Sequence, residues 1–260
     1  MVTRDTPWPA GTPCWVDLGV GDVAKATAFY RGLFGWDIQA GPPEAGGYSM
    51  CMLDGRAVAG IGQQMNPGTP PFWTTYLASD DADATAAKIT AAGGQVMMEP
   101  FEVMDVGRMF VASDPGGAAF GVWQARAHTG VGMANEPGSL AWNENMSRSF
   151  EVNKAFYHEV FGYDYTDIGG GDMEYATLDL AGGPVGGIGG LGPEQPASRP
   201  ASWVSYFAVT DTDAAVAKAV ELGGMVIAPP FDTPYGRMAA VADDQGAAFA
   251  VMTSAPPGES

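Results

Sequence analysis

Two acidic residues are the groups best placed to move a proton. Asp17 lies in the apolar stretch 14–20, two residues after Trp15, and Glu144 follows Trp142 by the same interval. Because side chains alternate along a strand, each carboxyl group shares a face with its tryptophan. An apolar neighbourhood raises the pKa of a carboxyl group. The sequence therefore predicts that Asp17 or Glu144 acts as a general acid or base.

A structural role is the alternative for both carboxyl groups. Each could cap backbone amides, or pair with Arg108 or Arg237 on a later strand. Since the acid occurs twice in equivalent places, it also fits a requirement of the fold. The sequence leaves both possibilities open.

Other common catalytic groups are poorly placed. His158 lies on a predicted helix, where its counterpart is Arg31, and we expect it to face solvent. His128 lies in a predicted linker, and no partner for a Ser–His–Asp or Cys–His arrangement is visible. The glycine clusters at 182–192 lack the Lys-Ser/Thr ending of a phosphate-binding loop and are expected to form turns.

Composition excludes several classes of protein. The formal charge of −18 argues against nucleic acid and anionic membranes as partners. Two cysteines cannot build a disulfide framework. There is no run of 18 apolar residues, and the start of the chain leads into prolines instead of a signal peptide. The expected location is the cytoplasm.

The chain contains two copies of one domain. Trp15, Phe29 and Gly35 each recur 127 positions later, as Trp142, Phe156 and Gly162. Further matches follow at nearly the same spacing, among them Trp73 with Trp203 and Gly107-Arg108-Met109 with Gly236-Arg237-Met238. We therefore predict an N-terminal extension (1–13), a first domain (14–124), a linker (125–140), a second domain (141–253) and a tail (254–260).

Within each copy the pattern of elements repeats again. In the first copy, short apolar stretches predict strands at 14–20, 36–40, 48–53 and 57–61, with a helix at 22–34 capped by Asp22 and ended by Gly35. A second unit follows, with a strand at 72–78, a helix at 81–92 and strands at 96–103, 109–112 and 119–123. Each half is thus a pair of βαβββ modules, and the fold class is α+β.

These features resemble the vicinal-oxygen-chelate superfamily, which includes glyoxalase I, bleomycin-resistance proteins and extradiol dioxygenases. The resemblance rests on Ala28-Phe29-Tyr30, Phe34-Gly35-Trp36, the helix start at Asp81, Ala92-Gly93-Gly94 and Asp114-Pro115-Gly116-Gly117, with the same series in the second copy. The tandem arrangement is similar to that of a two-domain actinobacterial group. The resemblance implies that each pair of modules forms an open, curved sheet, a half-barrel.

The resemblance also implies where a metal would bind. Metal-using members take His, Gln or Glu ligands from the first, fifth and eighth strands of each half-barrel, sometimes also the fourth. Here those three positions hold Trp15, Thr74 and Gly121 in the first copy, and Trp142, Val204 and Ala250 in the second. The fourth strands, 57–61 and 185–189, contain neither an acid nor a histidine. We therefore expect no metal ligands of the family type and no resident cofactor.

The residues around these positions predict a site for an apolar or aromatic molecule. Tyr76 and Tyr206 lie two residues beyond the fifth-strand position and should face inward, whereas Trp73 and Trp203 should pack under helices. The predicted ligand-binding residues are Trp15, Met50, Met52, Thr74, Tyr76, Gly121 and Trp123 in the first copy, and Trp142, Tyr175, Val204, Tyr206 and Met252 in the second. Gly121 is expected to leave more room than Ala250.

Three functions fit these observations. The first is metal-free binding of a small apolar or aromatic molecule, as in sequestration or resistance. The second is a metal-independent isomerase, cyclase or lyase acting on an aromatic or polyketide-like substrate, with Asp17 or Glu144 moving the proton. The third is a metal-dependent lyase or dioxygenase with other ligands. We expect a monomer with internal pseudosymmetry or a homodimer. Two locations for the ligand sites stay open, within each copy or between the two copies.

Overall fold

The computed structural model describes residues 2–64, 66, 68–171 and 173–254, and it contains two large sheets, one from each half of the chain. The first sheet has the strand order β3-β4-β5-β2-β6-β9-β8-β7. Its strands are β2 (Pro13–Val20), β3 (Asp37–Ala40), β4 (Ser49–Leu53), β5 (Arg56–Gln63), β6 (Phe72–Ala78), β7 (Gln95–Val103), β8 (Gly107–Ser113) and β9 (Ala119–Ala125).

The second half repeats this order. Its main path is β12-β13-β14-β11-β15-β18-β17-β16. These strands are β11 (Leu140–Ser147), β12 (Asp164–Asp167), β13 (Tyr175–Leu180), β14 (Gly183–Gly190), β15 (Ser202–Ala208), β16 (Met225–Thr233), β17 (Gly236–Ala242) and β18 (Ala248–Ser254). The α+β class and the tandem pairs of βαβββ modules are thereby confirmed, and the sheets are open, not closed barrels.

Four α-helices begin and end where the sequence places their caps. They are α1 (Val23–Phe34), α2 (Ala82–Ala91), α3 (Phe150–Phe161) and α4 (Thr212–Glu221). The Asp22 carboxylate accepts from the Lys25 amide at 3.0 Å, and Gly35 ends α1 with a φ of 72°. Glycine tolerates this left-handed conformation without steric cost, so it stops the helix. None of the described helices is long and apolar enough to cross a membrane.

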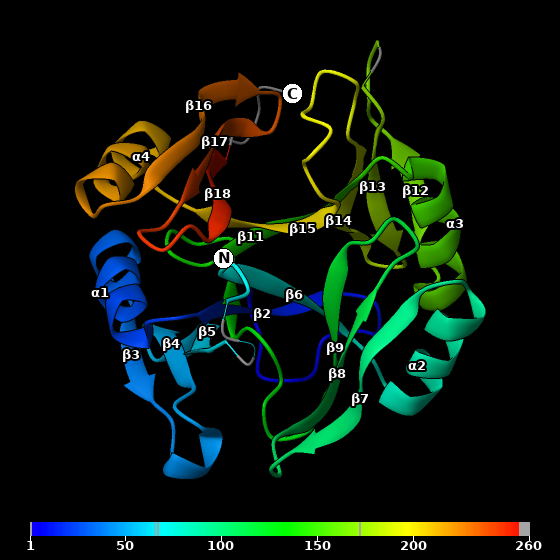
Figure 1. Ribbon diagram of the computed structural model, residues 1–260, viewed down its shortest axis with the longest axis horizontal. Coiled ribbons are helices and arrows are strands. Elements are labelled where there is room, and N and C mark those ends of the chain that lie inside the picture. Colours follow the sequence, from blue (N-terminus) through cyan, green and yellow to red (C-terminus); the bar gives the residue numbers. More distant parts are fainter. Residues whose placement is uncertain (1, 65, 67, 172, 255–260) are drawn as a thin grey trace.

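The two sheets pack with their convex faces toward each other, and their concave faces point toward the top and the bottom of Figure 1. Strands β6 and β15 meet at the centre of this interface. There the Thr75 hydroxyl donates to the Asn143 side-chain oxygen at 2.9 Å, and Ser205 lies beside them. The helices α1 and α4 flank one side of the pair, and α2 and α3 flank the other.

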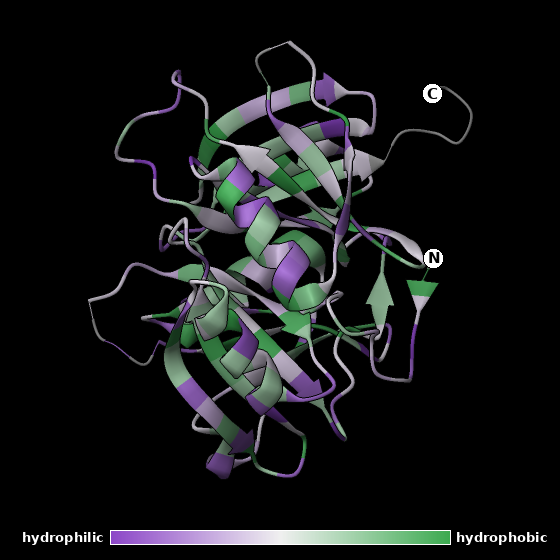
Figure 2. Ribbon diagram, turned by 90° about the vertical axis from the view of Figure 1, so that its right-hand side faces the viewer, coloured by the Kyte–Doolittle hydropathy of each residue, from purple (hydrophilic) through white to green (hydrophobic). Residues whose placement is uncertain are grey.

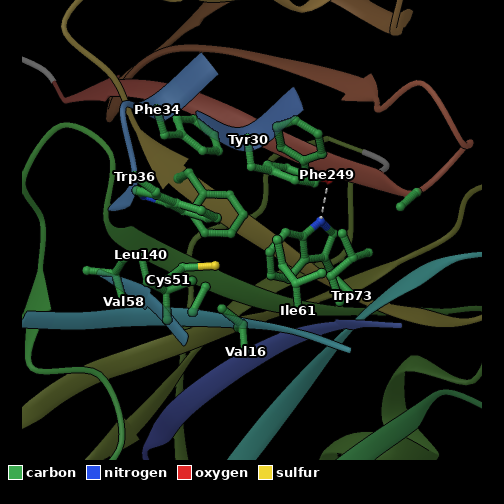
Figure 3. Close-up of a cluster of buried hydrophobic side chains, with 14 of the residues drawn as sticks. Val16, Tyr30, Phe34, Trp36, Cys51, Val58, Ile61, Trp73, Leu140 and Phe249 are labelled. Atoms are coloured by element: carbon green, nitrogen blue, oxygen red, sulfur yellow. Dashed lines mark hydrogen bonds between the residues drawn. The ribbon is translucent and has the colours of Figure 1, made fainter. Parts of the chain in front are cut away.

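One hydrophobic core is shared between the first and last modules of the chain. The ring centroids of Phe34 on α1 and Phe207 on β15 lie 5.1 Å apart, and those of Tyr30 and Phe249 on β18 lie 5.6 Å apart. Trp73 packs beneath α1, as expected, and its indole donates to the Tyr30 hydroxyl at 3.1 Å. Figure 3 shows this cluster, with residues of both sheets around Tyr30. Helix α1 therefore covers both halves at once.

A second core joins the two middle modules in the same way. Phe120 on β9 contacts Phe156 and Tyr157 on α3, and the Trp203 indole donates to the Tyr157 hydroxyl at 2.8 Å. Figure 2 looks onto this side and shows hydrophilic and hydrophobic residues mixed along the helices, as amphipathic packing requires.

A buried carboxylate fixes the two halves together at this second core. Asp114, in the turn after β8, accepts hydrogen bonds from Asn145 at 2.8 Å, Asn153 at 2.9 Å and Tyr157 at 2.9 Å, all from the second half. Burial raises the pKa of Asp114, and these donors offset part of that rise. Its counterpart Asp243 receives one such bond, from Tyr30 at 3.0 Å.

The predicted extension and linker form structure of their own. A short strand β1 (Val2–Thr3) in the extension pairs with β10 (Met133–Ala134) in the linker, and β10 pairs with β11. The predicted tail lies outside the described residues except for Ser254, the last residue of β18.

The expectation that the glycines at 182–192 form turns is wrong for most of them. Residues 183–190 form strand β14, which lies between β13 and β11. A Cβ at Gly187 would collide with the Tyr175 hydroxyl, and one at Gly189 would meet the Met146 sulfur. The glycines therefore make room for large side chains that lie across the strand.

Asp114 accepts three side-chain hydrogen bonds from the other half and Asp243 accepts one, so substitutions at the two positions test how much these bonds stabilise the contact between the halves. Asp114→Ala removes an acceptor shared by three buried side-chain donors from the other half, so we expect a loss of about 3–5 kcal/mol in the free energy of unfolding. Asp243→Ala removes the acceptor of one such donor and should cost about 1–3 kcal/mol. Urea denaturation measures both. Equal losses would contradict the proposed role of Asp114.

Candidate functional site

The concave face of the first sheet carries Asp17 at the centre of an aromatic hydrogen-bond network, which we call the first site. The Tyr76 hydroxyl donates to Asp17 Oδ2 at 3.0 Å, and the Tyr48 hydroxyl lies 3.4 Å from the same oxygen. The Trp15 indole donates to the Tyr48 hydroxyl at 2.9 Å. The first site therefore consists of Trp15, Asp17, Tyr48 and Tyr76.

The second sheet repeats this network around Glu144. Tyr206 donates to one oxygen of the Glu144 carboxylate at 2.6 Å, and Tyr175 donates to the other at 2.8 Å. The Trp142 indole donates to the Tyr175 hydroxyl at 3.1 Å. Trp142, Glu144, Tyr175 and Tyr206 form the second site, in which the carboxylate has one methylene more than in the first.

Strand register brings these residues together. Trp15 pairs with Tyr76 across β2 and β6, and the neighbouring pair on the same face is Asp17 with Thr74. The second half repeats these pairs as Trp142 with Tyr206 and Glu144 with Val204. Val16 and Leu18, which alternate with the site residues, are buried in the shared core.

Glycines beneath the tyrosine rings make these networks possible. A Cβ at Gly60, which pairs with Asp17, would collide with the Tyr48 hydroxyl. A Cβ at Gly121 would collide with the Tyr76 ring. The Tyr76 ring fills the volume that Gly121 leaves free, so Gly121 does not make room for a ligand. Gly187 does the same for Tyr175 in the second site.

Burial controls the electrostatics of both sites. Desolvation raises the pKa of Asp17 to about 6, and hydrogen bonds from Tyr76, Thr74 and Tyr48 limit the rise. Desolvation also raises the pKa of Glu144, which is 9% exposed, while Tyr206 and Tyr175 oppose the change. The pKa of Tyr76 and of Tyr206 lies well above its usual value, so these phenols stay protonated as donors.

The two arginines proposed as partners of the carboxylates bind elsewhere. Arg108 pairs with Asp83 at 2.8 Å and with Glu102 at 3.2 Å. Arg237 pairs with Asp213 and Asp232 in the equivalent way. In the described structure, tyrosine hydroxyl groups donate to Asp17 and Glu144, and neither carboxylate caps backbone amides.

The remaining predicted residues lie around the two networks. Met50 and Met52 lie on β4, where Met50 pairs with Gly60. Ala250 pairs with Tyr206 across β15 and β18, and Met252 follows on the same face. Trp123 on β9 is buried, and its indole donates to the backbone oxygen of His128 at 2.9 Å.

His128 belongs to the first site, which the sequence analysis missed. Its ring meets the Trp15 ring edge-on with centroids 4.3 Å apart and lies 5.4 Å from the Trp123 ring. Its buried Nε2 atom has no hydrogen-bond partner in the described structure, and desolvation lowers its pKa to about 4. A linker has no repeating pattern of apolar residues that would predict where His128 points. The only signal in the sequence was that the chain has just two histidines. His158 is exposed, as expected.

Comparison with known proteins identifies the family. The profile of the glyoxalase/bleomycin resistance protein/dioxygenase superfamily matches residues 14–122 and 146–251. The chain belongs to this superfamily. It is 45% identical over 255 residues to the protein named "Putative glyoxylase CFP32" of Mycobacterium tuberculosis, covering 95% of this chain and 96% of that protein. It is 39% identical over 266 residues to the anthracycline biosynthesis protein DnrV of Streptomyces peucetius, covering 96% and 95%.

Solved structures share the fold at low sequence identity. A Mn(II)-bound glyoxalase from Novosphingobium aromaticivorans aligns with a TM-score of 0.66 and 17% identity, covering 94% of this chain and 83% of that one. A 2,2′,3-trihydroxybiphenyl 1,2-dioxygenase from Sphingomonas wittichii aligns with a TM-score of 0.64 and 12% identity, covering 95% and 91%. These similarities show the architecture alone.

The residues present do not fit a metal site of the family type. At the expected ligand positions the structure has two tryptophans, Thr74, Val204, Gly121 and Ala250, which offer no imidazole or carboxylate. In the described part of the chain, no three His, Cys, Asp or Glu side chains gather closely enough to hold a metal ion. Each site carboxylate instead accepts from two phenols.

The Asp17 network predicts a measurable titration. With selectively ¹³C-labelled aspartate, Asp17 should titrate near pH 6. Tyr76→Phe should raise its pKa by about one pH unit because the donor to the charged form is lost. Tyr48→Phe, which removes the longer bond, should raise it less. A pKa near 4 that neither substitution changes would contradict this network.

The same titration fixes the sign of a stability effect. In the unfolded chain an aspartate titrates at about pH 3.9, below the folded value. Relative to Asp17→Asn, the wild-type protein should therefore keep its full stability below about pH 4 and lose part of it as the pH rises to about 6.

Proposed function

We propose that the protein binds a planar aromatic small molecule on the concave face of a sheet, at a carboxyl group held by two tyrosines. The observation that carries this proposal is the occurrence of the same tryptophan–tyrosine–carboxylate–tyrosine network in both halves. The carboxyl groups lie on the concave faces, whereas Val16 and Leu18, which alternate with the first-site residues, point into the shared core.

The chemistry of the network suits an aromatic ligand with polar edges. Tryptophan and tyrosine rings supply flat apolar area, and Met50, Met52 and Met252 add adaptable surface beside them. A carboxyl group with a raised pKa donates a hydrogen bond when protonated and accepts one when ionised. Together these groups would hold a ring system and fix its orientation. The names of DnrV and DauV, both anthracycline biosynthesis proteins, support a polycyclic aromatic ligand.

Proton transfer is the second candidate function. The pKa of Asp17, about 6, lies close to neutral pH, where a carboxyl group can both take and return a proton. A metal-independent isomerase, cyclase or lyase acting on an aromatic or polyketide-like substrate would use this property. Because Glu144 has the same surroundings, either carboxyl group would serve as the base.

A binding and turnover experiment separates these two functions. Isothermal titration with a tetracyclic anthracycline aglycone should show binding, and Glu144→Gln and Asp17→Asn together should weaken it about tenfold. If the protein only binds, the recovered aglycone is chemically unchanged after long incubation. Conversion that is lost in the double variant establishes the enzyme. The absence of binding by this and other planar aromatics would contradict the proposal.

Elemental analysis tests the remaining alternative, a metal-dependent lyase or dioxygenase with unusual ligands. We expect Mn, Fe, Ni and Zn at well below one equivalent per chain, because the donor set around both carboxylates is phenolic. Aromatic binding should also survive extensive dialysis against a chelator. One stoichiometric equivalent of any of these metals would overturn the metal-free proposal.

A further inference from the structure

The two sites differ in how far their aromatic side chains are covered. In the first half, Trp15, Tyr76 and Trp123 are only 3%, 5% and 6% exposed. Their counterparts in the second half, Trp142, Tyr206 and Met252, are all partly exposed. The strands around the two sites repeat in order and register, and the first site has in addition a covering segment that lies outside the repeat.

The covering segment is the linker that follows β9. The Val131 amide donates to the Cys14 oxygen at 2.8 Å, and the Gly132 amide donates to the Ala57 oxygen at 2.7 Å. The Trp8 indole donates to the Val131 oxygen at 3.1 Å, which also ties the N-terminal extension to this segment. The linker therefore lies against β2 and β5 at several fixed points.

His128 is the linker residue seated on the aromatic groups of the first site. Its flat, uncharged ring makes T-shaped contacts with the rings of Trp15 and Trp123, where a planar ligand would otherwise pack. The buried Nε2 atom has no hydrogen-bond partner in the described structure, so no hydrogen bond from this atom holds the imidazole in place. The imidazole resembles a small aromatic ligand in size and shape.

We propose that the second site is the ligand-binding site of the resting protein and that the linker closes the first site through His128. This inference rests on the proposed binding of an aromatic molecule and says which of the two networks receives it. The repeat provides two similar networks, and the linker leaves one of them accessible.

The loop before β15 is held by a clamp that the first half lacks. Arg148 holds this loop by donating to the backbone oxygens of Leu191, Gly192, Gln195 and Pro196 at 2.8–3.3 Å. The same loop carries Arg199, which is itself bonded to the Gln195 side chain at 2.7 Å.

Desolvation raises the pKa of Glu144 and of Tyr206, and the charge of Arg199 opposes a small part of that rise. The position equivalent to Arg148 in the first half is Gly21, so that half lacks the same clamp.

Two fluorescent probes test this inference on the whole protein. The anionic dye 8-anilinonaphthalene-1-sulfonate and its neutral analogue N-phenyl-1-naphthylamine share the same aromatic system. We expect one equivalent of each to bind, and Trp142→Ala to raise both Kd values about tenfold. In a ¹⁵N spectrum, the dye should shift the indole signal of Trp142 and leave that of Trp15 in place. If Trp142→Ala does not fold, the spectrum of the wild-type protein decides alone, because it reports on the Trp142 and Trp15 indoles without any substitution.

Removing the closing residue should open the first site. His128→Ala is expected to bind a second equivalent of dye and to show a shift of the Trp15 indole signal. His158→Ala, a change at an exposed histidine on α3, is the matched control and should keep one equivalent.

The outcomes separate this inference from the proposed function. If neither dye nor any planar aromatic binds, the proposed function fails and this inference fails with it. Two equivalents in the wild-type protein, or a shift of the Trp15 signal without one of Trp142, would overturn the inference and leave aromatic binding intact. A single equivalent in His128→Ala would show that the linker does not close the first site.

Discussion

The structure depends on the burial of two convex sheet faces against each other, with a helix from each half packed along the side against both sheets. Tyr30 and Phe34 on α1 contact β15 and β18 as well as their own sheet, and Tyr157 on α3 does the same with β9. Asp114 adds a buried carboxylate that accepts donors from the other half. Because the convex faces carry the core, the concave faces are free to hold polar groups that the fold does not require. Asp17 and Glu144 are two such polar groups on the concave faces.

Much of the fold follows from local chemistry that is readable in the sequence. The Asp22 and Gly35 caps, the alternation around Trp15 and Asp17, and the constant offset between the copies predicted the helices, the strand faces and the tandem modules. For β14 the sequence predicted a strand at 185–189 and also turns at the glycines of 182–192, because the need for these glycines comes from a ring on a neighbouring strand, Tyr175. Alternation along a strand predicts which face each side chain points to. Whether a Cβ would collide with a ring on the adjacent strand depends on the register between the two strands, which alternation does not predict.

The candidate site was predicted in part for the same reason. Alternation placed both carboxyl groups, Tyr76 and Tyr206 on one face, but the bonds that join Tyr48 to Asp17 and to Trp15 depend on how three strands pair. His128 was beyond such reasoning, because a linker has no period and its contacts form only when the chain turns back over β2. The cytoplasmic location and the monomeric or homodimeric state stay predictions. The family is common to lyases, dioxygenases and binding proteins, so function has to be argued from the site.

A crystal structure of the protein isolated from its natural host tests the central claim most directly, because it shows what the concave face holds in the cell. The account predicts density for an aromatic molecule against Trp142, with a polar atom in hydrogen-bond contact with Glu144 or Tyr206. A metal ion coordinated by Glu144, or a ligand bound away from both carboxylate networks, would contradict it.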